Sequence, residues 1–172
     1  MLGVEQSNDD LQAAIAGDKV FIRVTGRGSF KVSASLKQFI TQTASQQPVM
    51  TIVIDLAECI GMDSTFMGVL AGLSGRLKQN NQQLELINLS EKNARLLATL
   101  GVDQVIAHYS HSHGYEVPEQ AAKPLSSAGV TKKELAETAL QAHQSLAELN
   151  AENRPRFKRV IEYLQADVDR LN

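Results

Sequence analysis

Residues 49–70 read VMTIVIDLAECIGMDSTFMGVL, and this stretch decides the fold. Its first part, Val49 to Leu56, is short, rich in β-branched residues and apolar on both faces, as is typical of a central strand covered on its two sides. After residues 57–63, apolar residues recur at helical spacing, namely Phe66, Val69, Leu70, Leu73 and Leu77. We therefore predict a buried strand, a loop and a long amphipathic helix that ends near Lys78.

The residues before this stretch predict a hairpin and a first helix. Leu11 to Ala16 and Lys19 to Thr25 read as two strands joined by the Gly17-Asp18 turn. Gly26-Arg27-Gly28 is expected to break the second strand. Apolar residues at helical spacing follow over residues 32–44 and predict the helix.

The residues after it continue the alternation of strands and helices. Leu84 to Leu89 alternates as a strand, residues 90–101 predict a helix capped by Ser90 and ended by Gly101, and Val102 to Ala107 predict a last short strand. This order predicts an α/β fold with a mixed or largely parallel sheet of about four or five strands and helices packed on it. One such domain accounts for residues 1–110.

The C-terminal third has a different pattern. We expect residues 111–130 to be a linker, because they hold Gly, Pro and Ser with little periodicity. From Thr131 onward the pattern is helical, and Pro155 suits the first turn of a second helix better than the interior of one long helix. Residues 131–172 are therefore predicted to form a helical extension that either makes a homodimer or packs back on the domain.

The composition disfavours several classes of function. The 172 residues are 43% hydrophobic and 21% charged, and the formal net charge is -2. Such a chain folds, and it has no overall field that attracts nucleic acid or an anionic membrane. No apolar run reaches the roughly 18 residues of a membrane span. The opening residues carry acids where a secretory signal needs a basic start, so we expect a cytoplasmic protein.

Ser64 stands where the predicted loop gives way to the helix. A serine at such a point is most often the helix cap, with its hydroxyl near the free amides of the first turn. On position alone the cap is the simpler interpretation. The residues on either side of Ser64 favour a second role for this serine.

The sequence resembles the STAS domain family, the fold of bacterial anti-sigma factor antagonists, over roughly residues 10–108. The family's hallmark is an apolar strand ending in Asp-Leu, a short loop, and Met-Asp-Ser followed by Ser or Thr and an apolar helix. The matching residues here are Ile54-Asp55-Leu56, Met62-Asp63-Ser64-Thr65, Gly68-Val69-Leu70 and Gly75-Arg76-Leu77-Lys78.

The resemblance implies a switch rather than an enzyme. Ser64 would be phosphorylated by a GHKL-type serine kinase that doubles as an anti-sigma factor, and a serine phosphatase would reverse the change. A phosphate adds about -1.5 to -2 charges, which would release the partner without refolding the domain. Two other functions stay open: an unphosphorylated scaffold subunit of a larger signalling complex, and a STAS subunit that binds a nucleotide or a transporter partner.

The resemblance also implies a partner-binding surface around Ser64, comprising Asp63, Thr65, Met67, Gly68 and Ala71 in the helix and Arg27 and Ser29 in the earlier loop. The family usually has acids in that loop, so the facing charge of the kinase should differ. Small residues at 64, 68, 71 and 75 leave a stripe where a backbone could approach, and a helix of the same domain is the simpler occupant. Phe66 and Met67 replace the usual Gly and Leu and put a bulky ring at a position normally bare.

Other features carry weaker signals. His108, His111 and His113 are close in sequence, but no Cys and no paired carboxylate lies nearby, so we predict neither a metal nor a cofactor. Cys59 lacks a basic neighbour and is not expected to be reactive. His143 is expected to be exposed on the tail helix. No Walker loop, glycine-rich dinucleotide motif or nucleophile elbow occurs, so we predict no enzymatic activity.

Overall fold

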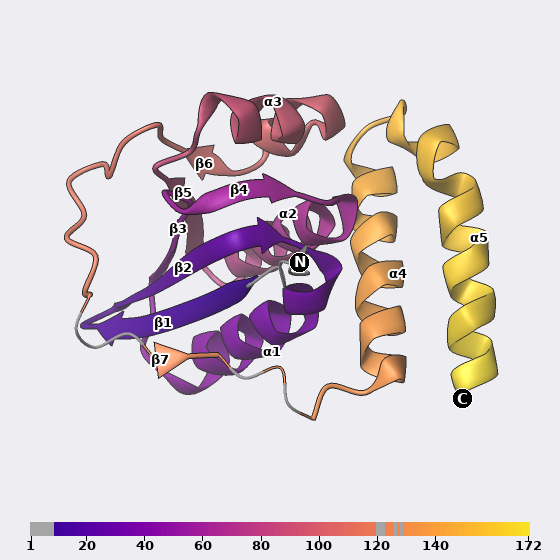
Figure 1. Ribbon diagram of the computed structural model, residues 1–172, viewed down its shortest axis with the longest axis horizontal. Helices are drawn as coiled ribbons and strands as arrows, with labels where there is room; N and C mark the ends of the chain where they lie inside the picture. Colours follow the sequence, from indigo (N-terminus) through magenta and orange to yellow (C-terminus); the bar gives the residue numbers. More distant parts are fainter. Residues whose placement is uncertain (1–8, 120–122, 126, 128) are drawn as a thin grey trace, which may run out of the picture.

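The computed structural model describes residues 9–119, 123–125, 127 and 129–172. Over these residues it contains a mixed sheet with helices packed on it, as predicted (Figure 1). The strands are β1 (Asp10–Ala16), β2 (Lys19–Gly28), β3 (Thr51–Asp55), β4 (Cys59–Met62), β5 (Gln83–Ile87), β6 (Ala107–His108) and β7 (Lys123–Pro124). The helices are α1 (Phe30–Gln46), α2 (Ser64–Gln79), α3 (Glu91–Leu100), α4 (Lys132–Leu149) and α5 (Asn153–Leu171).

Strand β3 lies inside the sheet, whose order is β6-β5-β3-β2-β1-β7, with β4 also paired to β2. Strands β2, β3, β5 and β6 run parallel, whereas β1 pairs antiparallel with β2. Ile52 and Ile54 are buried in the main core, and Val53 is buried in a smaller cluster. Because successive side chains of a strand point to opposite faces, both faces of β3 are covered, which explains its uninterrupted apolar run.

Three boundaries differ from the sequence prediction. Strand β2 does not break at Gly26 but runs on to Gly28, and its register with β4 shifts between Gly26 and Arg27. The glycines therefore mark a bulge rather than the end of a strand. Strand β4 lies within the predicted loop over residues 57–63. In place of a strand over residues 102–107, a 3-10 turn at Val102–Gln104 precedes the two-residue β6.

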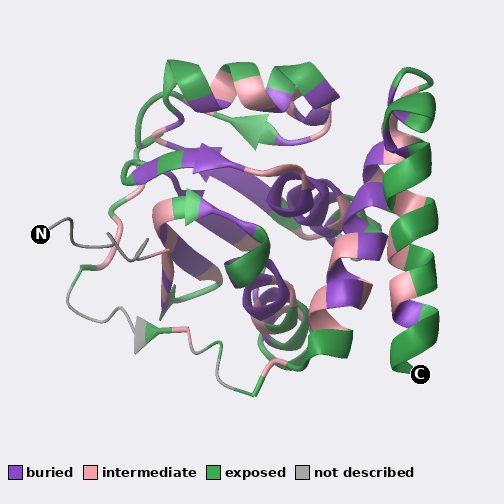
Figure 2. Ribbon diagram, turned by 45° about the vertical axis from the view of Figure 1, so that its right-hand side comes forward, coloured by how far each residue is buried: buried purple, intermediate pink, exposed green. Residues whose placement is uncertain are grey.

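Helices α1 and α2 pack together and bury their apolar sides in the main core, with Leu36, Ile40, Phe66 and Leu70 fully buried (Figure 2). Helix α3 begins and ends as predicted. The Ser90 side chain accepts a hydrogen bond from the Asn93 amide, and Gly101 ends the helix with a φ of 77°. No helix in the described part of the chain is both long and apolar enough to span a membrane.

The first half of the predicted linker lies against the second face of the sheet. Tyr109, Tyr115 and Val117 pack against the buried side chains of Phe21, Val53 and Ile87. The Tyr115 hydroxyl donates to Glu85 Oε2 at 2.5 Å. Burial, followed by this hydrogen bond, raises the pKa of Tyr115 to about 12. Both faces of the sheet are therefore covered, one by helices and one by this segment.

Helices α4 and α5 form an antiparallel hairpin beside the domain, with α4 against α2 and α5 on the outside (Figure 1). Thr131 and Glu134 form a capping box at the start of α4, and Pro155 stands in the first turn of α5, as predicted. The hairpin has a small apolar cluster of its own, formed by Ala136, Leu140 and Val168.

The turn of the hairpin is tied to the end of α3. Asn153 Nδ2 donates to the carbonyl oxygens of Leu100 and Leu146, both at 2.9 Å. Arg156 donates to the carbonyl oxygen of Thr99 at 2.9 Å. These bonds satisfy carbonyl groups that a helix end leaves free. The hairpin packs back on its own chain here, and a homodimer through residues 131–172 stays a prediction that the mass of the full chain in solution tests.

Candidate functional site

Asp63 holds the start of α2. Its carboxylate accepts two backbone hydrogen bonds, from Phe66 N to Oδ1 at 2.9 Å and from Phe30 N to Oδ2 at 2.7 Å. Because Phe30 is the first residue of α1, one side chain joins the N-termini of two helices. Asp63 is therefore the N-cap of α2 and Ser64 is its first helical residue, so the interpretation of Ser64 as the cap is wrong.

Replacing Asp63 with Ala is expected to lower the free energy of unfolding by about 2 kcal/mol, because the change removes a helix cap and leaves the Phe30 amide without its acceptor. Asp63→Asn keeps one carbonyl oxygen for the Phe66 amide and should lose about half as much. Urea unfolding of both variants and the parent measures these values. Equal stability of Asp63→Ala and the parent would show that the carboxylate does not hold the two helix starts.

The Ser64 hydroxyl, which does not cap α2, contacts the tail. Ser64 Oγ lies 2.9 Å from Nε2 of His143 in α4. The other ring nitrogen of His143, Nδ1, lies 2.7 Å from the carbonyl oxygen of Ala139. A carbonyl oxygen only accepts, so Nδ1 carries a proton, and in the tautomer that this contact selects Nε2 is the acceptor for the Ser64 hydroxyl.

His143 is buried, and the prediction that it is exposed is wrong. The residue is only 5% exposed, and its ring packs against that of Phe157 in α5 with centroids 5.3 Å apart and planes at 64°. Sequence reasoning missed this residue although a signal was present. His143 stands four residues after Ala139 and three before Leu146, which is the spacing of the buried side of α4.

Helix α4 covers the side of α2 that carries Gly68 and Gly72. A Cβ atom built on Gly68 would lie 2.3 Å from the carbonyl oxygen of Ala142, and one built on Gly72 would lie 3.0 Å from Ser145 Oγ. The close approach predicted for the small-residue stripe is thus made by the backbone of α4. Gly75, near the other end of α2, has no atom within 4 Å of a Cβ built on it.

The residues predicted to bind a partner differ in exposure. Asp63 and Ser64 are half-buried and Arg27 is exposed, whereas Thr65, Met67, Gly68, Ala71 and Ser29 are buried. The Ser29 hydroxyl donates to Asp9 Oδ2 at 2.9 Å, and the Arg27 amide donates to Asp9 Oδ1 at 3.0 Å. With the hairpin in place, the accessible part of the predicted surface is therefore confined to the N-terminus of α2 and Arg27.

The ring of Phe66 does not add bulk to the surface. Phe66 is fully buried, and a Cβ atom built on Gly28 would lie 2.6 Å from its ring. The glycine of β2 and the phenylalanine of α2 thus fit each other in the core. Phe66 therefore does not contribute to the accessible surface, because this face of α2 points toward the sheet.

A pocket that opens to solvent lies beside the contact between α2 and α4. A cavity of about 240 Å³ lies between α1, α2 and α4, and Lys37, Gly72 and Arg76 are among the residues that line it. Lys37 donates to the side chain of Gln141 in α4. Burial, together with the nearby Arg76, lowers the pKa of Lys37. The Glu137 carboxylate of α4 has the opposite, weaker effect on this pKa.

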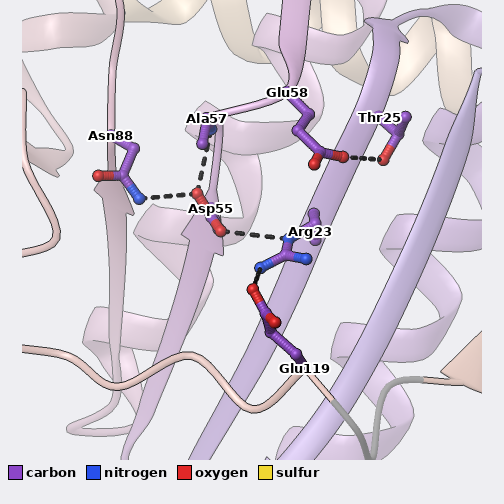
Figure 3. Close-up of polar contacts among 7 residues, drawn as sticks. All are labelled: Arg23, Thr25, Asp55, Ala57, Glu58, Asn88 and Glu119. Carbon is purple, nitrogen blue, oxygen red and sulfur yellow. Dashed lines mark hydrogen bonds and ion pairs between the residues drawn. The ribbon is translucent and has the colours of Figure 1, made fainter.

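A second polar cluster lies at the end of β3 and is paired within itself (Figure 3). Asp55 Oδ2 accepts from Arg23 Nε at 3.3 Å, and Oδ1 accepts from the Ala57 amide at 3.0 Å and from Asn88 Nδ2 at 2.9 Å. Arg23 also lies 3.9 Å from a Glu119 carboxylate oxygen. Both oxygens of Asp55 are occupied, so this cluster joins neighbouring strands and the 109–119 segment.

The clustered histidines are engaged in local contacts. His113 stacks on Tyr109 with ring centroids 3.6 Å apart, and His111 Nδ1 accepts from the His113 amide at 3.0 Å. Within the described residues, no group of three or more His, Cys, Asp or Glu side chains could hold a metal ion. Cys59 is buried, and its thiol donates to the carbonyl oxygen of Gly61 at 3.2 Å.

A family model described as "Mlab, STAS domain" matches residues 11–107, which is more than half of the chain of 172 residues. The chain belongs to the STAS domain family. The STAS match ends before α4 begins, so the hairpin that covers α2 lies outside the part that identifies the family.

Solved STAS structures share the fold at low identity. The anti-sigma factor antagonist SpoIIAA in its unphosphorylated form is 20% identical, with a TM-score of 0.52 over 57% of this chain and 86% of its own. A Thermotoga maritima protein assigned to the anti-sigma factor antagonists is 16% identical, with a TM-score of 0.54 over 60% and 88%. A sulfate transporter family protein from Wolinella succinogenes is 14% identical, with a TM-score of 0.52 over 58% and 83%. These likenesses establish the fold and leave the function to the site.

Proposed function

We propose that this STAS domain is a protein-interaction switch that binds a serine kinase acting as an anti-sigma factor and is released when Ser64 is phosphorylated. A serine phosphatase resets the switch. The observation that carries the proposal is the place of Ser64 in the Met62-Asp63-Ser64-Thr65 motif: it is the first residue of α2, and its hydroxyl is not used as the helix cap. That hydroxyl can be modified without removing the cap.

The start of α2 suits a phosphate group. In the transfer, Ser64 Oγ forms a bond to the γ-phosphorus of ATP, the bond from that phosphorus to the bridging oxygen breaks, ADP leaves, and a base of the kinase takes the hydroxyl proton. The free amides and the dipole at a helix N-terminus stabilise the added anion. Local structure therefore tolerates the modification.

The surface of the partner tolerates a phosphate on Ser64 less well. A kinase that fits a neutral Ser64 beside the Asp63 carboxylate meets a second negative group after phosphorylation, and like charges brought together at an interface cost several kcal/mol. Exposed Arg27 stands where the family usually carries acids, so we expect the cognate kinase to present an acidic group there. Charge complementarity of this kind determines which of several related partners binds.

A second candidate function is a subunit of a transport complex. The likeness to a sulfate transporter family protein supports it. In that role the domain binds a transporter partner, and phosphorylation of Ser64 is not needed.

Incubation with ATP and the GHKL-type serine kinases encoded near its gene distinguishes the two candidates. We expect the intact mass to rise by one phosphate, and Ser64→Ala to abolish the rise. Thr65→Ala is the matched control, because it removes the neighbouring hydroxyl, which is buried, and it should leave the rise unchanged. Absence of a mass change with every such kinase would contradict the switch and favour the transport complex.

A further inference from the structure

We propose that the α4–α5 hairpin is a tethered competitor for the partner surface, so that the kinase reaches Ser64 only after the hairpin leaves α2. This inference rests on the proposed function and adds a regulation of the same site. It concerns a part of the chain beyond residue 107, where the STAS match ends. Three observations carry it.

The first observation is that the reactive hydroxyl is already engaged. Ser64 Oγ donates to His143 Nε2 at 2.9 Å, and the ring of His143 is fixed by Ala139 and Phe157. For phosphoryl transfer the Oγ lone pair must face the γ-phosphorus of ATP in line with the leaving oxygen. Ser64 is half-buried, and the buried imidazole occupies one side of its hydroxyl, so the hydroxyl can turn toward ATP only when this contact breaks and α4 shifts.

The second observation is that the backbone of α4 covers the side of α2 that carries Gly68 and Gly72. Ala142 lies against Gly68 and Ser145 lies against Gly72, and the contact of the Ala142 backbone with Gly68 is too close for any side chain larger than hydrogen. Two helices cannot both pack on this side of α2 at the same time. A partner that uses it must also present a helix with small residues spaced three or four apart, as α4 does, and must displace α4.

The third observation is that the hairpin can leave as a unit. Ala136, Leu140 and Val168 hold α4 and α5 together independently of the domain. Helix α5 is largely exposed and lies outside α4 (Figure 2). Opening uncovers Leu146 and Phe157, so the open form is the minor one until a partner covers α2 again.

A reversible crosslink across the contact tests the inference. A Cβ atom built on Gly72 lies 3.7 Å from the Cβ of Ser145, which is the separation that a disulfide requires. Gly72→Cys combined with Ser145→Cys should form this bond on oxidation, while the native Cys59 stays buried and unreacted. Gly75→Cys with Ser145→Cys is the matched control, because nothing lies within 4 Å of a Cβ at Gly75.

The measured quantity is the rate at which the kinase phosphorylates Ser64 in the oxidised and in the reduced samples. We expect oxidation to lower the rate at least about tenfold in the Gly72→Cys pair, and reduction by dithiothreitol to restore it, because the crosslink removes the open form. The Gly75→Cys pair should keep the same rate in both conditions.

Other outcomes separate the two proposals. Equal rates in the oxidised and reduced Gly72→Cys pair would overturn the hairpin as a competitor and leave the phosphorylation switch intact. No phosphorylation in any sample, including the reduced parent, would overturn the switch and with it this inference. Failure of the Gly72→Cys pair to crosslink would show that α4 does not rest on α2 and would also overturn it.

Discussion

Gly68→Ala is expected to release the hairpin from α2, whereas Gly75→Ala on the same helix should leave it docked. The added methyl group at position 68 would lie 2.3 Å from the carbonyl oxygen of Ala142, which belongs to the backbone of α4 and cannot rotate away. At position 75 the same methyl group meets open space. The two variants thus make one chemical change in one helix and differ only in what faces it.

Stability should separate the two variants. Overpacking of this kind costs about 1–3 kcal/mol or more, whereas Gly→Ala in a free helix position gains up to about 1 kcal/mol. We therefore expect Gly75→Ala to unfold at a higher urea concentration than the parent. In Gly68→Ala, the urea transition in which the hairpin leaves α2 should be absent, while the unfolding transition of the STAS domain should remain.

A thiol placed in α4, on the side that faces α2, measures the release directly. Ser145→Cys faces Gly72 in the docked form, and native Cys59 is buried, so the reaction with a chromogenic disulfide reagent reports access to position 145. We expect the rate to rise at least about tenfold with Gly68→Ala and to stay unchanged with Gly75→Ala. Equal rates in both backgrounds would mean that α4 adjusts to the methyl group, and the tight contact would lose its proposed role.

Local patterns predicted the elements whose signals lie close together in the chain. Apolar residues on both faces of residues 49–56 predicted the central strand, and the Ser90 cap and terminal Gly101 predicted α3. The short strand β4 was not predicted, because four residues with a glycine among them show too little periodicity. The cap of α2 was misassigned because Asp63 and Ser64 are both good cap residues, and only the extended backbone of Asp63, with φ of -95°, separates them.

Contacts between distant segments could not be predicted in the same way. Ser64 and His143 are 79 positions apart, and nothing in either neighbourhood indicates that the two residues meet. Two patterns were compatible with the meeting: the small residues on α2 and the helical spacing of His143 with Ala139. Neither pattern predicts which helix packs on which side of α2, because many helices can pack on a row of small residues. Docking of α4 on α2 is decided by tertiary packing.

Phosphorylation of Ser64 is the change with the largest expected effect on binding. The phosphate brings about -1.5 to -2 charges to a point next to the Asp63 carboxylate, and the helix N-terminus stabilises them in the free domain. An interface built for the neutral hydroxyl has no such compensation. The loss of several kcal/mol corresponds to an affinity that is at least about a hundredfold weaker. The effect should appear in the dissociation rate, since most affinity changes within one interface do.

The central claim is that one hydroxyl at the start of α2 controls protein binding by its charge. Its most direct test is the dissociation constant of the complex between the cognate kinase and the full chain, measured by titration calorimetry before and after stoichiometric phosphorylation. We predict that phosphorylation weakens binding at least about a hundredfold and that phosphatase treatment restores it. Equal affinity for the two forms, with the phosphate verified on Ser64, would contradict the claim.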